Sequence, residues 1–405
     1  MSVIECINNH SQWLDFLFYK QNNDSLKGYE EKAIKQFIDN KRYEYFYEHI
    51  KAGSFPTDYA HKIIINKEGT CKKRVVYSYS EEENIILKFI AHKLYCFDEH
   101  FCDSCYAFRR GYGVRDAVRK FSGNEEFAEK YCFKADISNY FNSIDVDMLL
   151  EKMAFIKEKD GELFLLFERM LKEECVYEDK KLVSERHGAM AGTPCSPFFA
   201  NIYLTDMDRL FEEHNVTYFR YSDDILIFAD TREDLEEQIK AFYKQLEGHR
   251  LMLNHSKVKI TGPGETFEFL GFAYDNGTID LSANTMRKLK AKIKRKAAAL
   301  RRWQRKKGLA EEKAAIGFIN AMNRKFYGGS DKAWGEDSFT WCRWFFPNIT
   351  TDKSLKEIDD YMQEYIRYAI TGRHYKGNYR ITYEQMKAWG YRSLVNEYYN
   401  WKNHK

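Results

Sequence analysis

The sequence predicts an α+β protein, in which an antiparallel sheet carries acidic residues and helical segments lie outside it. Residues 218–229 place aromatic and β-branched residues on both sides of a Ser-Asp-Asp tripeptide, which is typical of two antiparallel strands that meet at a hairpin turn. Residues 1–62 instead space apolar side chains at helical period, for example Trp13, Phe16 and Leu17. We therefore expect a helical lead-in before a central sheet.

Two adjacent carboxylates, Asp223 and Asp224, occupy the predicted turn. They repel each other and lose hydration unless a cation compensates them, and their hard oxygen ligands favour Mg²⁺. A two-metal site for phosphoryl transfer needs a further carboxylate from another strand. Residues 133–144 supply one, because strand alternation puts Asp136 on the face opposite to Phe133.

The composition is that of a globular protein inside a cell. With 405 residues the chain can form one large domain or two to three small ones, and 44% of its residues are hydrophobic. No stretch approaches the roughly 18 apolar residues that span a bilayer, and the first ten residues lack a signal pattern. Nine cysteines without regular spacing indicate reduced thiols. We expect a cytoplasmic protein without a membrane partner.

Three more segments carry clear patterns. A hairpin is predicted from Lys62 to Tyr77, with a polar turn at residues 67–70 and with Lys73 and Arg74 at the start of its second strand. The many aromatic residues between 325 and 405 favour a compact helical cap. A loop that leads into a helix is predicted around Gly192, Pro194 and Pro197, whose backbone preferences suit such a turn. This loop would let the backbone approach a ligand closely.

In this order the segments resemble the motifs of a reverse transcriptase. The acidic strand at Asp136 and the acidic hairpin at Asp223 are similar to motifs A and C. Residues 105–118 are similar to the Gly-Phe-Arg-Pro-Gly element of group II intron reverse transcriptases, with Ala107 for Gly and Arg110 for Pro. The other motifs match segments in family order, namely motif B at 188–204, motif D at 251–260 and motif E at 267–272.

The resemblance implies a right-hand polymerase fold, with fingers, a palm built on an antiparallel sheet, a helical thumb and a small helical C-terminal cap. The expected divisions are an N-terminal extension at 1–62, fingers at 63–125, palm at 126–280, thumb at 281–330 and a C-terminal extension at 331–405.

The resemblance also implies roles for single residues. Asp136, Asp223 and Asp224 are the expected catalytic residues and, with the Ile137 carbonyl, the expected Mg²⁺ ligands. The residues expected to contact the incoming nucleotide are Lys73, Arg74, Arg109, Ile137, Phe141 and Lys257.

Each nucleotide-binding role has a chemical reason. The Arg109 fork suits a phosphate, the Phe141 ring would exclude a ribose 2′-hydroxyl, and Lys257 could act as general acid toward pyrophosphate. The alternatives are a solvated turn for Lys73 and Arg74, a core position for Phe141 and an exposed surface position for Lys257.

A strongly basic segment follows the palm motifs. Residues 287–307 hold twelve Lys or Arg and no acid, although the net charge of the chain is only +3. As the expected thumb helix, this segment would be about 30 Å long at 1.5 Å per residue. We favour duplex binding over a solvated helix, because so many like charges repel each other without phosphates. Lys290, Lys294 and Arg301 lie near one face and are the expected contacts.

The expected function is that of an RNA-directed DNA polymerase. The short motif B loop, with Cys195 where many relatives have Gln, is closer to retron and phage-defence reverse transcriptases than to group II enzymes. Together with the small C-terminal cap it most resembles the stand-alone defence enzymes. We expect the chain to make cDNA from a noncoding RNA template and dNTPs in antiviral defence, and to hold the RNA/DNA duplex. The alternatives are a retron-type enzyme, a template-independent abortive-infection DNA polymerase and a vestigial RNA-binding scaffold. The presence of all three aspartates argues against the scaffold.

Overall fold

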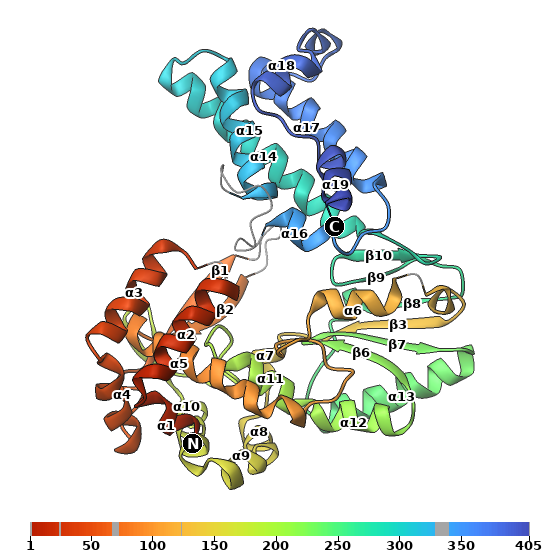
Figure 1. The fold of residues 1–405 in the computed structure, drawn as a ribbon. Coiled ribbons are helices and arrows are strands. Elements are labelled where there is room, and N and C mark those ends of the chain that lie inside the picture. Colours follow the sequence, from red (N-terminus) through yellow and green to blue (C-terminus); the bar gives the residue numbers. More distant parts are fainter. Residues whose placement is uncertain (1, 24–25, 67–72, 123, 329–339, 405) are drawn as a thin grey trace. The chain divides into compact units, whose positions relative to one another are not determined.

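The structure is a computed structural model that describes residues 2–23, 26–66, 73–122, 124–328 and 340–404 (Figure 1). It divides into two compact units. The first unit contains residues 1–117 and 129–263, and the second contains residues 118–128 and 264–405. Each unit is described by itself.

The first unit begins with four short helices, which confirms the helical lead-in. These are α1 (Val3–Ile7), α2 (His10–Asn23), α3 (Gly28–Asp39) and α4 (Arg42–Lys51). They pack on α5 (Glu81–Lys93), which Ser80 starts with a capping box that includes Glu83. The Trp13 ring of α2 is fully buried and stacks on Phe89 of α5 with centroids 4.0 Å apart.

A four-stranded sheet follows these helices. Its strands are β1 (Ala60–Asn66), β2 (Lys73–Ser78), β4 (Cys175–Glu178) and β5 (Lys181–Ser184), in the order β2-β1-β4-β5. β1 and β2 are antiparallel with Ile64 opposite Val75, as the hairpin pattern predicts, whereas β1 and β4 are parallel. The predicted turn at 67–70 lies outside the described residues.

The central sheet of the first unit is fully antiparallel. It contains β3 (Tyr131–Asp136), β6 (Thr217–Tyr221), β7 (Asp224–Ala229) and β8 (Lys259–Thr261), in the order β6-β7-β3-β8. Phe133 and Ala135 point into the core, and Asp136 lies directly opposite Asp224 across the strand pair. The predicted acidic strand and acidic hairpin are therefore neighbours in one sheet. The helix α13 (Arg232–Gly248) covers the core side, where its Phe242 contacts Phe133.

Short helices complete the first unit. They are α7 (Tyr140–Ser143), α8 (Val146–Lys152), α9 (Ala154–Lys159), α10 (Gly161–Lys172), α11 (Ser196–Tyr203), α12 (Thr205–Glu213) and the 3₁₀ segments η1 (Leu94–His100) and η3 (His255–Lys257). The helix α6 (Val114–Phe121) crosses the boundary between the units.

The second unit combines a small sheet with long helices. It contains η2 (Glu125–Ala128), β9 (Phe267–Phe269), β10 (Phe272–Asp275), β11 (Thr278–Leu281), α14 (Ala283–Lys307), α15 (Glu312–Tyr327), α16 (Trp341–Phe345), α17 (Lys353–Thr371), η4 (Lys376–Arg380), α18 (Tyr383–Ala388) and α19 (Leu394–Asn403). The three strands are antiparallel in the order β11-β10-β9. An apolar stripe that includes Met286, Leu289 and Ile293 packs α14 against α15 and α17.

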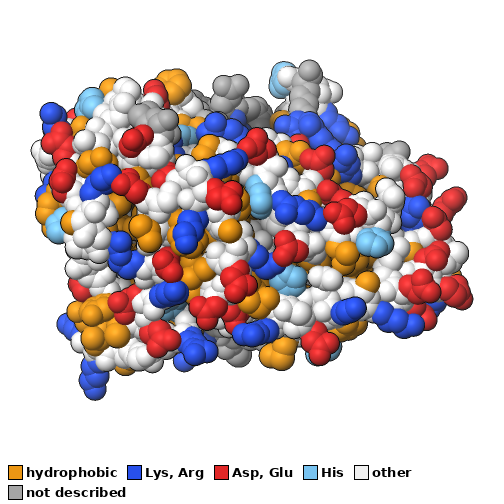
Figure 2. All heavy atoms as spheres, turned by 90° about the horizontal axis from the view of Figure 1, so that it is seen from below, with side chains coloured by type: hydrophobic (Ala, Val, Ile, Leu, Met, Phe, Trp, Pro, Cys, Tyr) orange, Lys and Arg blue, Asp and Glu red, His pale blue; other side chains and the backbone are white. Residues whose placement is uncertain are grey.

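The surface shows mixed charge. Acidic and basic side chains are interspersed over most of the face in Figure 2, and acidic ones gather at the right-hand end of that view. None of the helices in the described part of the chain is both long and apolar enough to span a bilayer.

Candidate active site

The hairpin of β6 and β7 presents two carboxylates at its tip. Tyr221 and Asp224 are the last paired residues, so Ser222 and Asp223 form a two-residue turn. Of these two, only Ser222 has a positive φ, 60°, as in a type II′ turn. The backbone N–H of Ile137 donates to the Asp223 carbonyl at 3.1 Å, which ties the tip to the strand that carries Asp136.

Side chains of three strands form a row across one face of this sheet. Tyr221, Asp224 and Asp136 are direct cross-strand partners and therefore point to the same side. Lys134, two residues before Asp136, places its Nζ 4.0 Å from Asp224 Oδ1. At the other end of the row, Lys257 Nζ contacts Asp136 Oδ2.

The ionised forms of Asp223 and Asp224 are electrostatically unfavourable in this position. Burial raises the pKa of Asp223 and of Asp224, and the negative charge of Asp136 raises both further. Lys134 lowers the pKa of Asp224, and Lys257 lowers the pKa of both carboxyls, but neither lysine cancels the effect of burial. An additional cation would therefore be bound favourably.

The donor set fits a hard divalent cation. It consists of three carboxylates and nearby backbone carbonyls, which are the oxygen ligands that Mg²⁺ prefers. Within the described residues, no three acidic, histidine or cysteine side chains already converge as a metal-binding group. The Asp136 carboxylate instead accepts hydrogen bonds from Lys257 and, at 3.3 Å, from the Asn254 side chain. Asp136 is thus paired with Lys257 rather than with a residue of the hairpin tip.

A buried ion pair supports the hairpin from inside. Arg220, two residues before Ser222, is fully buried and donates from Nε to Asp208 Oδ1 at 2.7 Å and from Nη2 to Asp208 Oδ2 at 2.5 Å. Its guanidinium also contacts Cys105 Sγ at 3.2 Å and the Ser222 carbonyl at 3.5 Å. This pair was not predicted from the sequence. The available signal was a charged residue inside an apolar strand, because such a residue needs a buried partner.

The predicted motif B loop packs closely on its neighbours. Gly192 has a φ of 103°, and a Cβ there would lie 2.9 Å from Val76 Cβ of β2. At Gly188 a Cβ would lie 2.5 Å from the Phe141 carbonyl oxygen, so this backbone approach also requires glycine. Phe141 is half-buried, and Cys195 is fully buried with its Sγ toward the Leu87 carbonyl.

The predicted nucleotide-binding cations occupy different environments. Lys73 and Arg74 are exposed at the start of β2. Arg109 is 8% exposed, and its guanidinium donates to the carbonyls of Cys102 and Cys105 at 2.6 and 3.0 Å. Its Nη atoms thus contact backbone carbonyls, and its buried Nε–H has no hydrogen-bond partner among the described residues, so the phosphate contact expected for Arg109 stays a prediction.

The basic residues of α14 that were expected to contact phosphate lie in different environments. The side chains of Lys290 and Arg301 lie toward α17: Lys290 pairs with Glu357, and Arg301 is 8% exposed and donates to the Thr371 carbonyl at 3.0 Å. Lys294 is exposed. Opposite the apolar stripe, four exposed basic residues form what we call the outer face of α14, namely Lys288, Arg295, Arg302 and Lys306.

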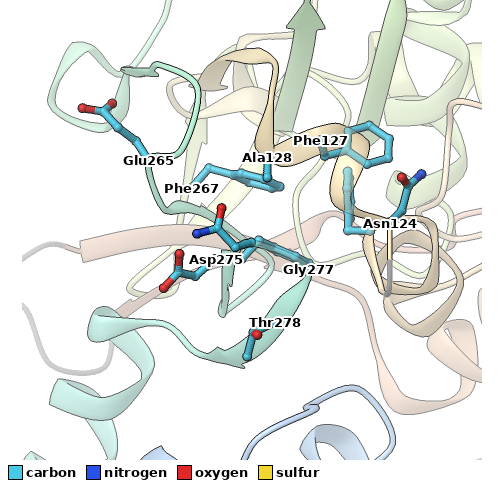
Figure 3. Close-up of a pocket in the computed structure, with 11 residues that line it drawn as sticks. Asn124, Phe127, Ala128, Glu265, Phe267, Asp275, Gly277 and Thr278 are labelled. Carbon is cyan, nitrogen blue, oxygen red and sulfur yellow. The ribbon is translucent and has the colours of Figure 1, made fainter.

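A separate pocket lies in the second unit. None of the predicted site residues lines it (Figure 3). Phe127 lies on one side, and the carboxylates of Glu265 and Asp275 lie on the other. The Phe267 and Tyr274 rings stack with centroids 4.7 Å apart, so the pocket is part of a packed aromatic cluster.

Comparison with known proteins identifies the family. The family model described as "Reverse transcriptase (RNA-dependent DNA polymerase)" matches residues 65–274, more than half of the chain. This range includes Asp136, Asp223 and Asp224, which we call the acidic row, and the buried pair of Arg220 and Asp208. No curated protein matches the chain.

Solved telomerase structures are distantly similar. Apo telomerase from Candida tropicalis aligns at 10% identity with a TM-score of 0.45, over 78% of this chain and 57% of that one. Telomerase from Candida albicans, in complex with a fragment of telomeric RNA, aligns at 12% identity and a TM-score of 0.43, over 84% and 62%. This chain thus spans about 60% of the length of those two proteins. On the strength of the family match, the chain belongs to the reverse transcriptases, the RNA-dependent DNA polymerases.

Proposed function

We propose that Asp136, Asp223 and Asp224, with the Ile137 carbonyl, are the Mg²⁺ ligands and catalytic residues of this polymerase. Bound Mg²⁺ would stabilise charge on the attacking and leaving oxygens of nucleotidyl transfer. The observation that carries the proposal is the placement of Asp136 directly opposite Asp224, with burial raising the pKa of both Asp223 and Asp224.

The protein residues have defined tasks in this reaction. The primer 3′-hydroxyl oxygen attacks the α-phosphorus of a deoxynucleoside triphosphate, and the bond from that phosphorus to the bridging oxygen of the pyrophosphate breaks. The hydrogen bond between Ile137 and Asp223 holds the hairpin tip in register with β3. Lys257 neutralises Asp136 before substrates bind, and once released it can protonate the leaving pyrophosphate.

Choice of sugar is assigned to Phe141. Its backbone is fixed by the close approach of Gly188, and its half-buried ring is available to a substrate. A ring beneath the sugar leaves no room for a 2′-hydroxyl. Phe141 would therefore select deoxynucleotides.

The template is proposed to be a noncoding RNA, and the biological role antiviral defence, within the group II intron-derived lineage. Support comes from the short loop between Gly188 and Pro194 and from the small C-terminal cap, which resemble those of stand-alone defence reverse transcriptases. Sequencing the nucleic acid that copurifies with the chain tests this part. Recovery of cDNA from one structured RNA is expected, and DNA without any RNA template would contradict it.

The catalytic assignment is tested by replacing Asp223 and Asp224 with alanine. The variant should fold, because the changes remove two carboxylates whose ionised forms are disfavoured by burial and leave the backbone pairing of the hairpin intact, and it should lose DNA synthesis on a primed RNA template. A matched control is Asp230→Ala in the exposed loop after β7. Wild-type synthesis by the double variant, or equal loss in the control, would contradict the assignment.

A further inference from the structure

Phe108 is an exposed aromatic residue in an unusual backbone conformation next to the acidic row. Its φ is 57°, in the left-handed region that bulky side chains rarely adopt, and 41% of the residue is exposed. An exposed ring held in such a conformation is a reason to look for a function.

Both neighbours of Phe108 are anchored. The carbonyl of Ala107, which is buried, accepts a hydrogen bond from Asn201 Nδ2 at 2.7 Å. Arg109 is held by its carbonyl contacts, and the Arg110 N–H donates to Asp98 Oδ2 at 2.7 Å. Because the chain is fixed on both sides, Phe108 must bridge the two anchors in the left-handed conformation, and its ring is directed away from the core.

The ring lies beside two other aromatic residues of the site. Its centroid is 6.4 Å from that of Phe141, at an interplanar angle of 71°, and 6.3 Å from that of Tyr221. The angle to Phe141 is that of an edge-to-face pair. Since Tyr221 is the cross-strand partner of Asp224, these three rings extend the acidic row on the side away from Lys257. We call them the aromatic wall.

We propose that Phe108 determines specificity for the sugar by holding the Phe141 ring in place within the aromatic wall. Phe141 is only half-buried, so the contact with Phe108 restricts the positions that its ring can adopt. A glycine would meet the backbone requirement at position 108 without strain, whereas only an aromatic residue supplies the edge-to-face contact. Phe108 is thus a positioning residue, and the inference rests on the proposed role of Phe141.

The test measures single-nucleotide incorporation on a primed RNA template with matched deoxy- and ribonucleoside triphosphates. The readout is the ratio of kcat/KM for the two sugars. Damage to folding lowers both values alike and leaves this ratio unchanged. Phe108→Ala should lower the preference for deoxynucleotides about 2- to 10-fold, the range expected for loss of one aromatic pair. Phe108→Tyr, which keeps the ring, should retain the wild-type ratio.

Two comparisons separate the effect of the Phe108 ring from the effect of its backbone conformation and test whether it acts through Phe141. Phe108→Gly relieves the left-handed conformation, so it should be at least as stable as Phe108→Ala and show the same low preference. In Phe141→Ala, the further change Phe108→Ala should have no effect on the ratio, because the two residues act together.

The outcomes distinguish the two proposals. If Phe141→Ala changes the ratio and Phe108→Ala does not, the inference about Phe108 is wrong and the role of Phe141 stands. If neither change alters the ratio, the role of Phe141 is wrong, and the inference fails with it. If the two effects add in the double variant, Phe108 does not act through Phe141 and the inference is overturned.

Discussion

Asp223 and Asp224 show, at the scale of single residues, how a site for a cation differs from a structural ion pair. Each carboxyl is half-buried beside other acids, and the partial loss of hydration raises its pKa. The carboxylate of Asp208, by contrast, is fully buried and accepts two hydrogen bonds from the guanidinium of Arg220. In the first arrangement the nearby lysines only partly offset the negative charge, whereas in the second the guanidinium pairs with both oxygens of the carboxylate. This difference leads to opposite predictions for substitution.

Asp223→Asn should stabilise the metal-free protein at neutral pH, because a neutral amide replaces a carboxylate whose ionised form is disfavoured by burial. The melting temperature of the variant without metal should exceed that of the wild type. Added Mg²⁺ should raise the melting temperature of the wild type more than that of the variant. If Asp223→Asn melts at a lower temperature than the wild type without metal, the ionised Asp223 carboxylate is not destabilising and this account is wrong.

The same reasoning predicts a dependence on pH. A carboxyl whose pKa is higher in the folded than in the unfolded protein binds its proton more tightly when folded. Asp223 and Asp224 therefore add stability at low pH, and this contribution is lost as the pH rises from the unfolded value of about 3.9 through the raised folded values. Without metal, the melting temperature of Asp223→Asn minus that of the wild type should increase over this range. A difference in melting temperature that does not change with pH would contradict the raised pKa of Asp223.

Arg220→Met should destabilise the protein by about 3–5 kcal/mol, because it leaves Asp208 buried without its partner. Urea denaturation of the first unit measures the change. The matched control is Arg232→Met, which removes the solvent-exposed pair with Glu236 and should cost less than about 1 kcal/mol. Adding Asp208→Leu to Arg220→Met should recover part of the loss. Equal effects of the two single changes would contradict the importance of the buried pair.

At the scale of elements, α14 shows how one helix uses basic residues in two ways. Arg301 lies in line with the apolar stripe and binds carbonyls at the end of α17, so it stabilises the helix pair. Lys288 and Arg302 lie on the outer face and are exposed. Phosphate binding is therefore expected of the outer face.

Replacing Lys288 and Arg302 with Gln should weaken binding to an RNA/DNA duplex and flatten its salt dependence. With a slope of about −0.9 per phosphate for a DNA duplex, loss of two contacts should reduce the slope by about 2. The control replaces Lys240 and Lys244, which are exposed on α13. A slope that is unchanged by the α14 substitutions, or equally changed by the control, would place duplex binding elsewhere.

At the scale of the whole molecule, the N-terminal helices share a compact unit with the acidic row. The Trp13 indole donates to the Ile7 carbonyl at 2.8 Å and stacks on Phe89, so α2 is joined to α5 through a fully buried ring. The segment before the first strand is thus part of the core on which the site depends.

Trp13→Ala should destabilise the first unit by about 3–5 kcal/mol, the usual cost of removing a buried aromatic side chain. Polymerase activity should consequently be lost at a lower temperature than in the wild type. Phe18→Ala is the control on the same helix, because Phe18 is 68% exposed and its loss should change stability by less than about 0.5 kcal/mol. Equal heat inactivation of both variants would contradict this account.

The right-hand polymerase fold class and the reverse transcriptase family were both predictable from the sequence, and both are confirmed. The acidic strand and the acidic hairpin were found because strand alternation and turn chemistry depend on residues close together in the chain. The same local rules placed Phe133 in the core and Asp136 on the opposite face. The catalytic roles of the site residues remain predictions.

Only the tertiary structure decided which charges are buried and which are exposed. Lys290, Lys294 and Arg301 share a helix side with neighbouring apolar residues, and the position of α17 determined that Lys290 and Arg301 turn toward it. The environments of Arg109 and Arg220 likewise depend on partners distant in sequence, such as Asp98 and Asp208. Local sequence patterns predict on which face of its helix or strand a charged side chain lies. Whether that charge meets a carbonyl, a carboxylate or water depends on what packs against that face, because burial and pairing set its free energy.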